Sequence, residues 1–139
     1  MSSFQKVTDA DTSFITATRG VKVLVKPLYN PTLTNQQVGI YVYNYTITIE
    51  NEGGSTVQLI SRHWIIKDGF GKTEHVVGEG VVGKQPTLKP GESFTYTSSC
   101  PLQTPTGSMR GTFQMKGEDG RMFDAVIGEF QLAHTSLVN

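Results

Sequence analysis

The 139-residue sequence has little cysteine, no excess of either charge and no long apolar run. Cys100 is the only cysteine, which excludes an intrachain disulfide and a cysteine-cluster zinc site. Lys and Arg total 12 and Asp and Glu total 12, and this balance argues against a nucleic-acid partner, because such binders usually carry a basic surplus. The N-terminal stretch never becomes apolar, so we expect a cytoplasmic protein with no signal peptide and no membrane partner.

Recognisable catalytic patterns are also missing. The sequence has no G-x-S-x-G elbow, no H-E-x-x-H pair and no close carboxylate pair within an apolar run. Cys100 has no histidine or other base beside it in the chain, so an ordinary structural thiol is expected. The sequence therefore predicts a non-enzymatic protein with no cofactor.

The three histidines, His63, His75 and His134, show no metal-ligand spacing, so no metal site is predicted. A hairpin about the glycine-rich turn at 68–71 would nevertheless bring His63 and His75 onto neighbouring strands. One interpretation is a weak divalent-metal site completed by Glu74 or Glu79. The interpretation that we favour is a hydrogen-bonded strand histidine and an exposed one, because ligation also needs convergent geometry and supporting contacts.

What the sequence has in abundance is period-two alternation of apolar and polar residues, which is typical of half-buried β-strands. The alternating segments are 21–26, 43–49, 93–97, 109–115 and 130–132. Turn sequences rich in glycine separate such runs, at 51–54, 68–71, 89–92 and 118–120. Together they predict an all-β fold, an antiparallel β-sandwich of about seven to nine strands in one domain spanning 1–139.

One segment, 57–66, changes parity. Its apolar residues begin on odd positions and then occupy both parities, so either both faces are covered or a β-bulge redirects the chain. We expect Trp64 in the core, because large aromatic residues are mostly buried. Arg62 is then expected at the surface, where arginine is enriched in binding sites.

A glycine-rich stretch at 78–86 matches two phosphate-binding sequence motifs. Gly78, Gly80 and Gly83 fit G-x-G-x-x-G, and the run ending at Lys84 fits G-x-x-x-x-G-K. Both motifs need a helix after the loop, and the prolines at 86 and 90 leave no room for one. We expect a structural loop, with an anion-binding nest of backbone amides beside Lys84 as the alternative.

Several short motifs follow one another in a fixed order, at 45–51, 61–66, 77–83, 85–86, 90–92 and 96–98. In this order they resemble the ApaG family of small bacterial proteins, also called CorD, over roughly 21–132. The resemblance implies an immunoglobulin-like or fibronectin type III-like sandwich with that core, a flexible N-terminal segment and a C-terminal tail. Lys84 departs from the acidic residue of many members, which favours an anion there over a metal.

The resemblance also implies a cytoplasmic location and a genetic association with cobalt tolerance and magnesium efflux. Similar domains in eukaryotic F-box proteins and in a polymerase-δ-interacting protein look like protein-interaction modules. This implies a binding role, although a fold by itself does not identify the partner.

We therefore expect a module that binds another protein through the 78–86 loop and the neighbouring 61–64 segment. Docking would use a strand edge or loop, with polar contacts from Arg62 and Glu79. The rival is a small-ligand module that binds pyrophosphate or a nucleotide, with or without a divalent ion. Both a monomer and a homodimer fit the sequence. The candidate residues are Arg62, His63, Gly78, Glu79, Gly80, Gly83 and Lys84.

Overall fold

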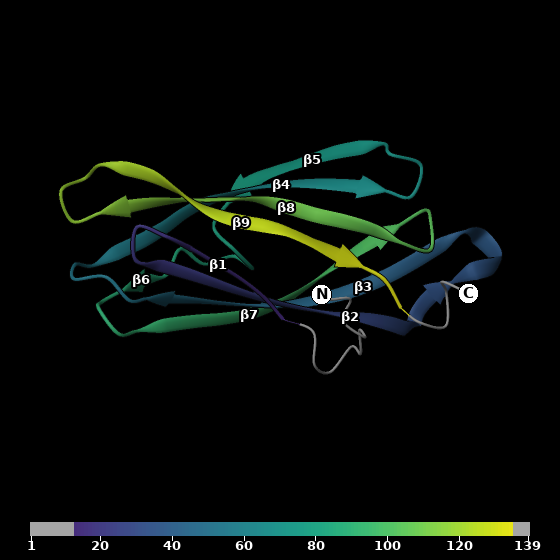
Figure 1. The fold of residues 1–139 in the computed structure, drawn as a ribbon, viewed down its shortest axis with the longest axis horizontal. Helices are drawn as coiled ribbons and strands as arrows, with labels where there is room; N and C mark the ends of the chain where they lie inside the picture. Colours follow the sequence, from purple (N-terminus) through teal and green to yellow (C-terminus); the bar gives the residue numbers. More distant parts are fainter. Residues whose placement is uncertain (1–12, 135–139) are drawn as a thin grey trace, which may run out of the picture.

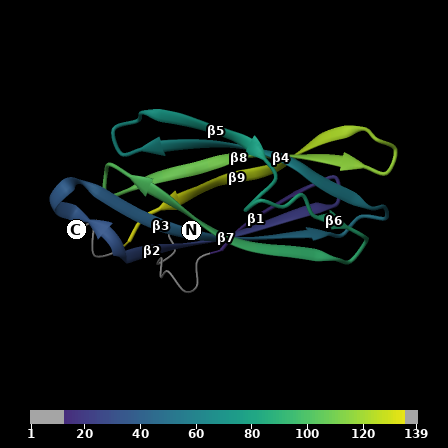
Figure 2. The same ribbon diagram turned by 180° about the vertical axis from the view of Figure 1, so that it is seen from behind.

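The computed structural model describes residues 13–134, which form two antiparallel sheets packed face to face (Figures 1 and 2). One sheet has the strand order β1-β2-β3-β7, and the other has the order β5-β4-β8-β9 with β6 paired to β4. The nine strands confirm the predicted all-β sandwich. Their bounds are β1 (Phe14–Thr18), β2 (Val21–Asn35), β3 (Ile40–Asn51), β4 (Val57–Asp68), β5 (Thr73–Glu79), β6 (Thr87–Leu88), β7 (Ser93–Leu102), β8 (Gly107–Gly117) and β9 (Met122–Leu132).

The core lies between the sheets and is built from the apolar positions of the alternating segments. Residues 21–25 alternate between buried valines and half-buried residues in β2, and residues 43–49 alternate between buried tyrosines or isoleucines and half-buried residues in β3. Trp64 is 3% exposed, which confirms its predicted core position. Its ring meets Tyr45 from the opposite sheet at a centroid distance of 5.4 Å and Phe130 at 6.0 Å, so one large aromatic joins the two layers.

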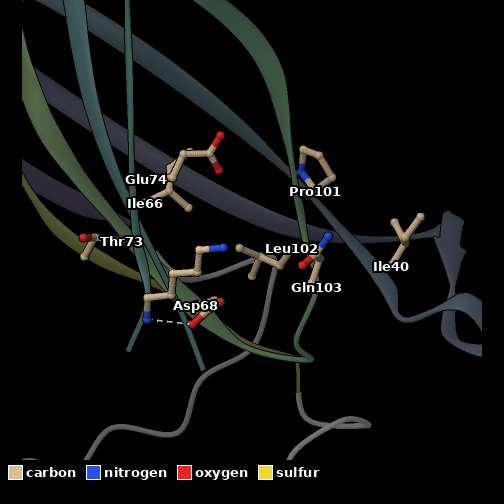
Figure 3. Close-up of a pocket in the computed structure, with 9 residues that line it drawn as sticks. Ile40, Ile66, Asp68, Thr73, Glu74, Pro101, Leu102 and Gln103 are labelled. Carbon is tan, nitrogen blue, oxygen red and sulfur yellow. Dashed lines mark hydrogen bonds between the residues drawn. The ribbon is translucent and has the colours of Figure 1, made fainter. Parts of the chain in front are cut away.

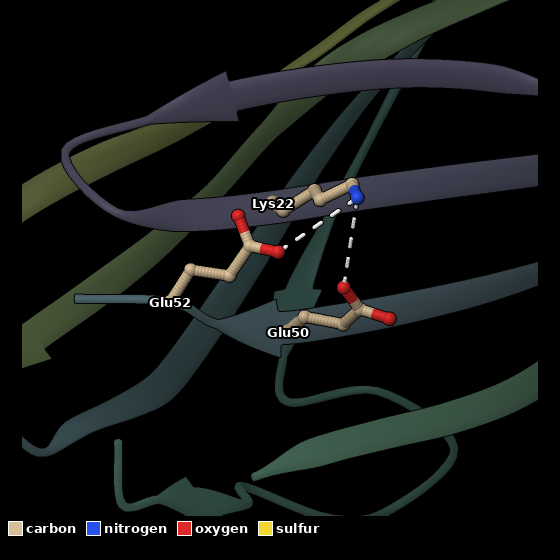
Figure 4. Close-up of polar contacts among 3 residues, drawn as sticks. All are labelled: Lys22, Glu50 and Glu52. Atoms are coloured by element: carbon tan, nitrogen blue, oxygen red, sulfur yellow. Dashed lines mark ion pairs between the residues drawn. The ribbon is translucent and has the colours of Figure 1, made fainter. Parts of the chain in front are cut away.

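The outer face of the four-stranded sheet carries charged side chains. Lys22 on β2 lies 3.8 Å from a carboxylate oxygen of Glu50 and 3.7 Å from one of Glu52 (Figure 4). These pairs are about one-third exposed or more, so each contributes little to stability. This face shows no concentration of the residues expected to bind.

The two side edges of the sandwich differ. On one side β1 packs along β9, and the Thr16 and Thr18 hydroxyls accept hydrogen bonds from the backbone N–H groups of Gly128 and Val126, at 3.0 and 3.1 Å. On the other side β5 and β7 each end their sheet, with one neighbouring strand in the described chain. We call this second side the open edge. An unpaired strand edge is a template for added backbone hydrogen bonds.

The ends of the chain extend beyond the expected core. The core at 21–132 leaves out β1, which begins at Phe14. The segments predicted to be flexible fall mostly at 1–12 and 135–139, outside the described residues. Within 13–134, no helix is long and apolar enough to cross a membrane.

Candidate functional site

A β-bulge in β4 explains the change of parity at 57–66. In the pairing of β4 with β8, Leu59 is opposite Met115 and Ser61 is opposite Gln114, which leaves Ile60 as the extra residue. Leu59 is therefore inward on one side of the bulge, and Trp64 is inward on the other. Of the two explanations considered for this segment, the structure shows the bulge.

The bulge is also the attachment point of the glycine-rich loop. We call residues 78–86 the glycine loop. The Ile60 carbonyl accepts hydrogen bonds from the Gly80 N–H and from the Gln85 side-chain amide, both at 2.8 Å. The Leu59 N–H donates to the Pro86 carbonyl at 3.0 Å. A bulge frees backbone groups from the strand ladder, and here the loop satisfies them.

The tip of the glycine loop is a tight two-residue turn. Val81 and Lys84 exchange backbone hydrogen bonds of 2.8 and 2.9 Å, and Val82 and Gly83 between them have φ of +44° and +79°. Two positive φ values in succession are typical of a type I′ turn. Val81 is 1% exposed and anchors the turn in the core. The chain then enters strand β6, so the predicted absence of a helix after the loop is confirmed.

Three amide groups of this loop donate hydrogen bonds within the protein. Gly80 donates to Ile60, while Val81 and Lys84 donate to each other's carbonyls. A Cβ on Gly80 would stand 2.3 Å from the Lys84 carbonyl oxygen, so the glycine is needed for a close approach of two backbone segments. An anion-binding nest needs several free amides pointing to one place. The Gly80, Val81 and Lys84 amides are not free for that role.

Arg62 points toward the loop from the inner side of β4. It is paired with Gly78 of β5, and its Nη1 donates to the carbonyls of Glu79 at 3.0 Å and Gly80 at 2.9 Å. A Cβ on Gly78 would lie 2.8 Å from both terminal guanidinium nitrogens. The absence of a side chain at Gly78 therefore allows the Arg62 guanidinium to pass close to the backbone of β5. The surface role predicted for Arg62 is untested, but its guanidinium is half-buried and engaged with the loop.

Burial raises the pKa of three weakly acidic side chains, Tyr45, Tyr96 and Cys100. Burial raises the pKa of Tyr96 and of Tyr45, and the Arg62 charge opposes the rise in both. Burial also raises the pKa of the Cys100 thiol to about 12, with the Glu74 carboxylate adding to the rise. A buried thiol with a raised pKa is a poor nucleophile, and the burial of Cys100 fits the expected structural cysteine.

The other candidate residues fall in two places. Glu79, Gly83 and Lys84 are exposed at the end of β5 and the tip of the loop. His63 lies on the opposite, outer face of β4, where its Nε2 is 2.9 Å from Nδ1 of His75. The predicted hairpin neighbourhood of the two histidines is confirmed. The structure thus brings Arg62, Gly78, Glu79 and Gly80 together and leaves His63 apart.

A groove lies at the open edge, at the far end of β5 from the glycine loop (Figure 3). It has a volume of about 580 Å³ and an apolar floor, and the Asp68 and Glu74 carboxylates and Lys72 line its β4–β5 side. We call it the edge groove. Its apolar lining comes from both sheets: Ile40 on β3, Ile66 on β4, and Pro101 and Leu102 on β7.

The edge groove was not identified from the sequence, because its walls come from three separate parts of the chain, at 40, 66–74 and 101–103. Ile60 was also not singled out, although the change of parity pointed to its neighbourhood. Among residues 13–134, no group of three or more His, Cys, Asp or Glu side chains is arranged to hold a metal ion.

Comparisons with known proteins agree with this architecture. A family model described as the ApaG domain matches residues 31–117. The protein ApaG of Caulobacter vibrioides is 50% identical over 115 residues, covering 83% of this chain and 82% of its own. That of Anaeromyxobacter dehalogenans strain 2CP-C is 47% identical over 122 residues, covering 88% and 96%.

Solved structures of similar sequence have the same fold. A crystal structure of an ApaA protein from Bordetella pertussis superposes with a TM-score of 0.80 at 50% identity, covering 83% of this chain and 94% of that one. The family model spans more than half of the chain, and these relatives match most of its length. The chain therefore belongs to the ApaG family.

Proposed function

We propose that this chain is a non-enzymatic binding module that takes an extended segment of a partner protein along its open edge. The observation that supports the proposal is the asymmetry of the sandwich. One edge is covered by β1 through the Thr16 and Thr18 hydroxyls, whereas β5 and β7 are terminal strands with the edge groove between them.

The mode of binding follows from the properties of a strand edge. A partner segment added beside β5 would gain backbone hydrogen bonds, and the groove would accept one of its apolar side chains. Ile40 is 39% exposed at the groove and offers contact area without being part of the buried core. Glu79, exposed at the opposite end of β5, supplies a polar contact.

The glycine loop has a supporting role in this proposal. Its hydrogen bonds to Ile60 and Leu59, together with the Arg62 contacts, fix the end of β5. A fixed edge lowers the entropy cost of binding, because the receptor strand needs no ordering. Arg62 then acts by positioning the edge, and Glu79 and Lys84 remain available to the partner.

The proposal retains the expected cytoplasmic location and excludes nucleic acid and membranes as partners. It also accommodates the association of the family with cobalt tolerance and magnesium efflux, with the partner protein carrying that activity. A second copy of the chain pairing through β5 would give the homodimer.

The test is quantitative capture from lysate of the source cell with a matched pair of variants. Ile40→Glu places a charge at the edge groove, and Ile15→Glu places the same charge on β1, where Ile15 is 60% exposed. A protein retained by the native chain and by Ile15→Glu, but lost with Ile40→Glu and weakened by Glu79→Ala, supports the proposal once binding is reproduced with purified components. Recovery of no protein with this pattern rejects the open edge as the docking surface.

A further inference from the structure

A pair of histidines, His63 on β4 and His75 on β5, lies on the outer face of the five-stranded sheet. In the pairing of β4 with β5, His63 is opposite Val77 and His75 is opposite Ile65, which makes the two histidines diagonal neighbours on one face. Their ring centroids are 5.1 Å apart. His75 is exposed and His63 half-buried, so solvent reaches the pair.

The distance between the ring nitrogens is the key observation. Nε2 of His63 and Nδ1 of His75 are 2.9 Å apart, so one nitrogen carries a proton and the lone pair of the other accepts it. Two imidazole nitrogens bound to one ion at about 2.0–2.1 Å lie about 2.9 Å apart at a right angle and about 3.3 Å apart at the tetrahedral angle. Two rigid neighbouring strands therefore already hold the nitrogens at a ligand separation. To bind a shared ion, the donating histidine must carry its proton on its other ring nitrogen, and the rings must rotate so that both lone pairs face the ion.

We propose that His63 and His75 form a two-histidine site for a borderline divalent ion, with water completing its coordination. The described chain has no third His, Cys, Asp or Glu arranged with them, so the site is open and solvent-accessible. Imidazole suits Cu²⁺, Ni²⁺ and Zn²⁺, and affinity rises from Ni²⁺ to Cu²⁺ and falls again at Zn²⁺. Mg²⁺ prefers oxygen ligands and is not taken by this pair.

The surroundings of the pair are compatible with a cation. His63 lines a depression together with Arg110 and the carboxylates of Asp124 and Glu129, so negative charge outweighs positive charge there. Val77 is 71% exposed opposite His63 and leaves the approach to the pair open. Because this is the outer face of the sheet, occupancy by an ion leaves the edge groove and the glycine loop undisturbed.

The experiment is a titration of the tag-free full chain with Zn²⁺, followed by long-range ¹H–¹⁵N NMR of the histidine rings. We expect one equivalent to shift Nε2 of His63 and Nδ1 of His75 and to leave His134 unchanged. Copper binding measured in parallel should be tighter, and its electron paramagnetic resonance spectrum should show coupling to two nitrogens. Mg²⁺ at the same concentrations should produce no shift.

Variants separate this site from adventitious binding. His63→Ala and His75→Ala should each raise the dissociation constant at least about tenfold, equivalent to about 1.4 kcal/mol. His134→Ala is the matched control and should bind as the native chain does. Circular dichroism confirms that each variant is folded. Absence of saturable shifts at the two rings, or binding that survives both alanine variants, would overturn the proposal.

Discussion

Gly78→Ala is the substitution that most directly probes the contact between β4 and the glycine loop. The new Cβ would stand 2.8 Å from both terminal nitrogens of Arg62, so the guanidinium must move away. Its hydrogen bonds to the Glu79 and Gly80 carbonyls, at 3.0 and 2.9 Å, would then be lost or lengthened. Hydrogen bonds from a charged donor contribute about 1.5–3 kcal/mol each, and partial exposure of Arg62 places the two together at about 2–3 kcal/mol.

The opposing effect is the better strand propensity of alanine. Gly78 lies within β5 without a positive φ, where alanine is favoured over glycine by about 0.5–1 kcal/mol. Gly78→Ala should therefore lower the free energy of unfolding by about 1–2.5 kcal/mol, measured by urea denaturation. In an Arg62→Ala background the clash no longer exists, and the same substitution should raise the free energy of unfolding by about 0.5–1 kcal/mol.

The reversal of sign is the decisive feature of this double-mutant cycle. Gly54→Ala serves as the control, because a Cβ there meets nothing within 4 Å, and it should change stability by less than about 0.5 kcal/mol. Equal destabilisation by Gly78→Ala with and without the Arg62 side chain would refute the prediction. It would show that the hydrogen bonds of Arg62 to the loop do not require glycine at position 78.

Three further predictions concern single substitutions in β3, β7 and the glycine loop. Tyr96→Phe should leave the free energy of unfolding in urea unchanged or raised, because the Tyr96 hydroxyl is buried without a hydrogen-bond partner in the described chain. Tyr43→Phe should lower it by about 1 kcal/mol, because the Tyr43 hydroxyl donates to the Pro105 carbonyl at 2.7 Å. An equal loss in both variants would contradict this prediction. Val82→Asn should raise the thermal midpoint, with a gain of about 1 kcal/mol, since asparagine tolerates the positive φ of +44°, and an unchanged midpoint would show that the turn is unstrained. Burial raises the pKa of Cys100 from 9.0 to about 12, so between these pH values the folded protein keeps a proton that the unfolded chain releases. The free energy of unfolding should therefore fall between about pH 9 and 12, and it should fall less steeply in Cys100→Ala than in the native chain. Parallel pH profiles of the two proteins would refute this prediction.

The sequence alone predicts those parts of the fold that depend on local pattern. Alternation at 21–26 and 43–49 marks β2 and β3, because each side chain in a strand is either inward or outward. The change of parity at 57–66 predicts an irregularity, and the structure places a bulge at Ile60. The two prolines after the glycine loop exclude a helix for a steric reason that needs no tertiary information.

The candidate site is harder to predict because it depends on contacts between distant segments. The position of the bulge decides which face of the sheet the Arg62 side chain occupies. That position becomes known only from the pairing of β4 with β8. Three glycines satisfy the phosphate-motif positions, but the acceptor of the Gly80 amide, the Ile60 carbonyl, lies on another strand. The edge groove joins Ile66 on β4 to Leu102 on β7, and only the packing of the two sheets brings these residues together.

The central claim is that the glycine loop is a structural element that fixes the end of β5 and is not a phosphate site. An amide-resolved NMR titration with pyrophosphate tests it most directly, because millimolar dissociation constants are about the weak limit of useful affinity. The hydrogen bonds of the loop predict that the Gly80, Val81 and Lys84 amides show no saturable shift up to that concentration. Saturable shifts centred on these three amides would contradict the claim and favour the small-ligand alternative.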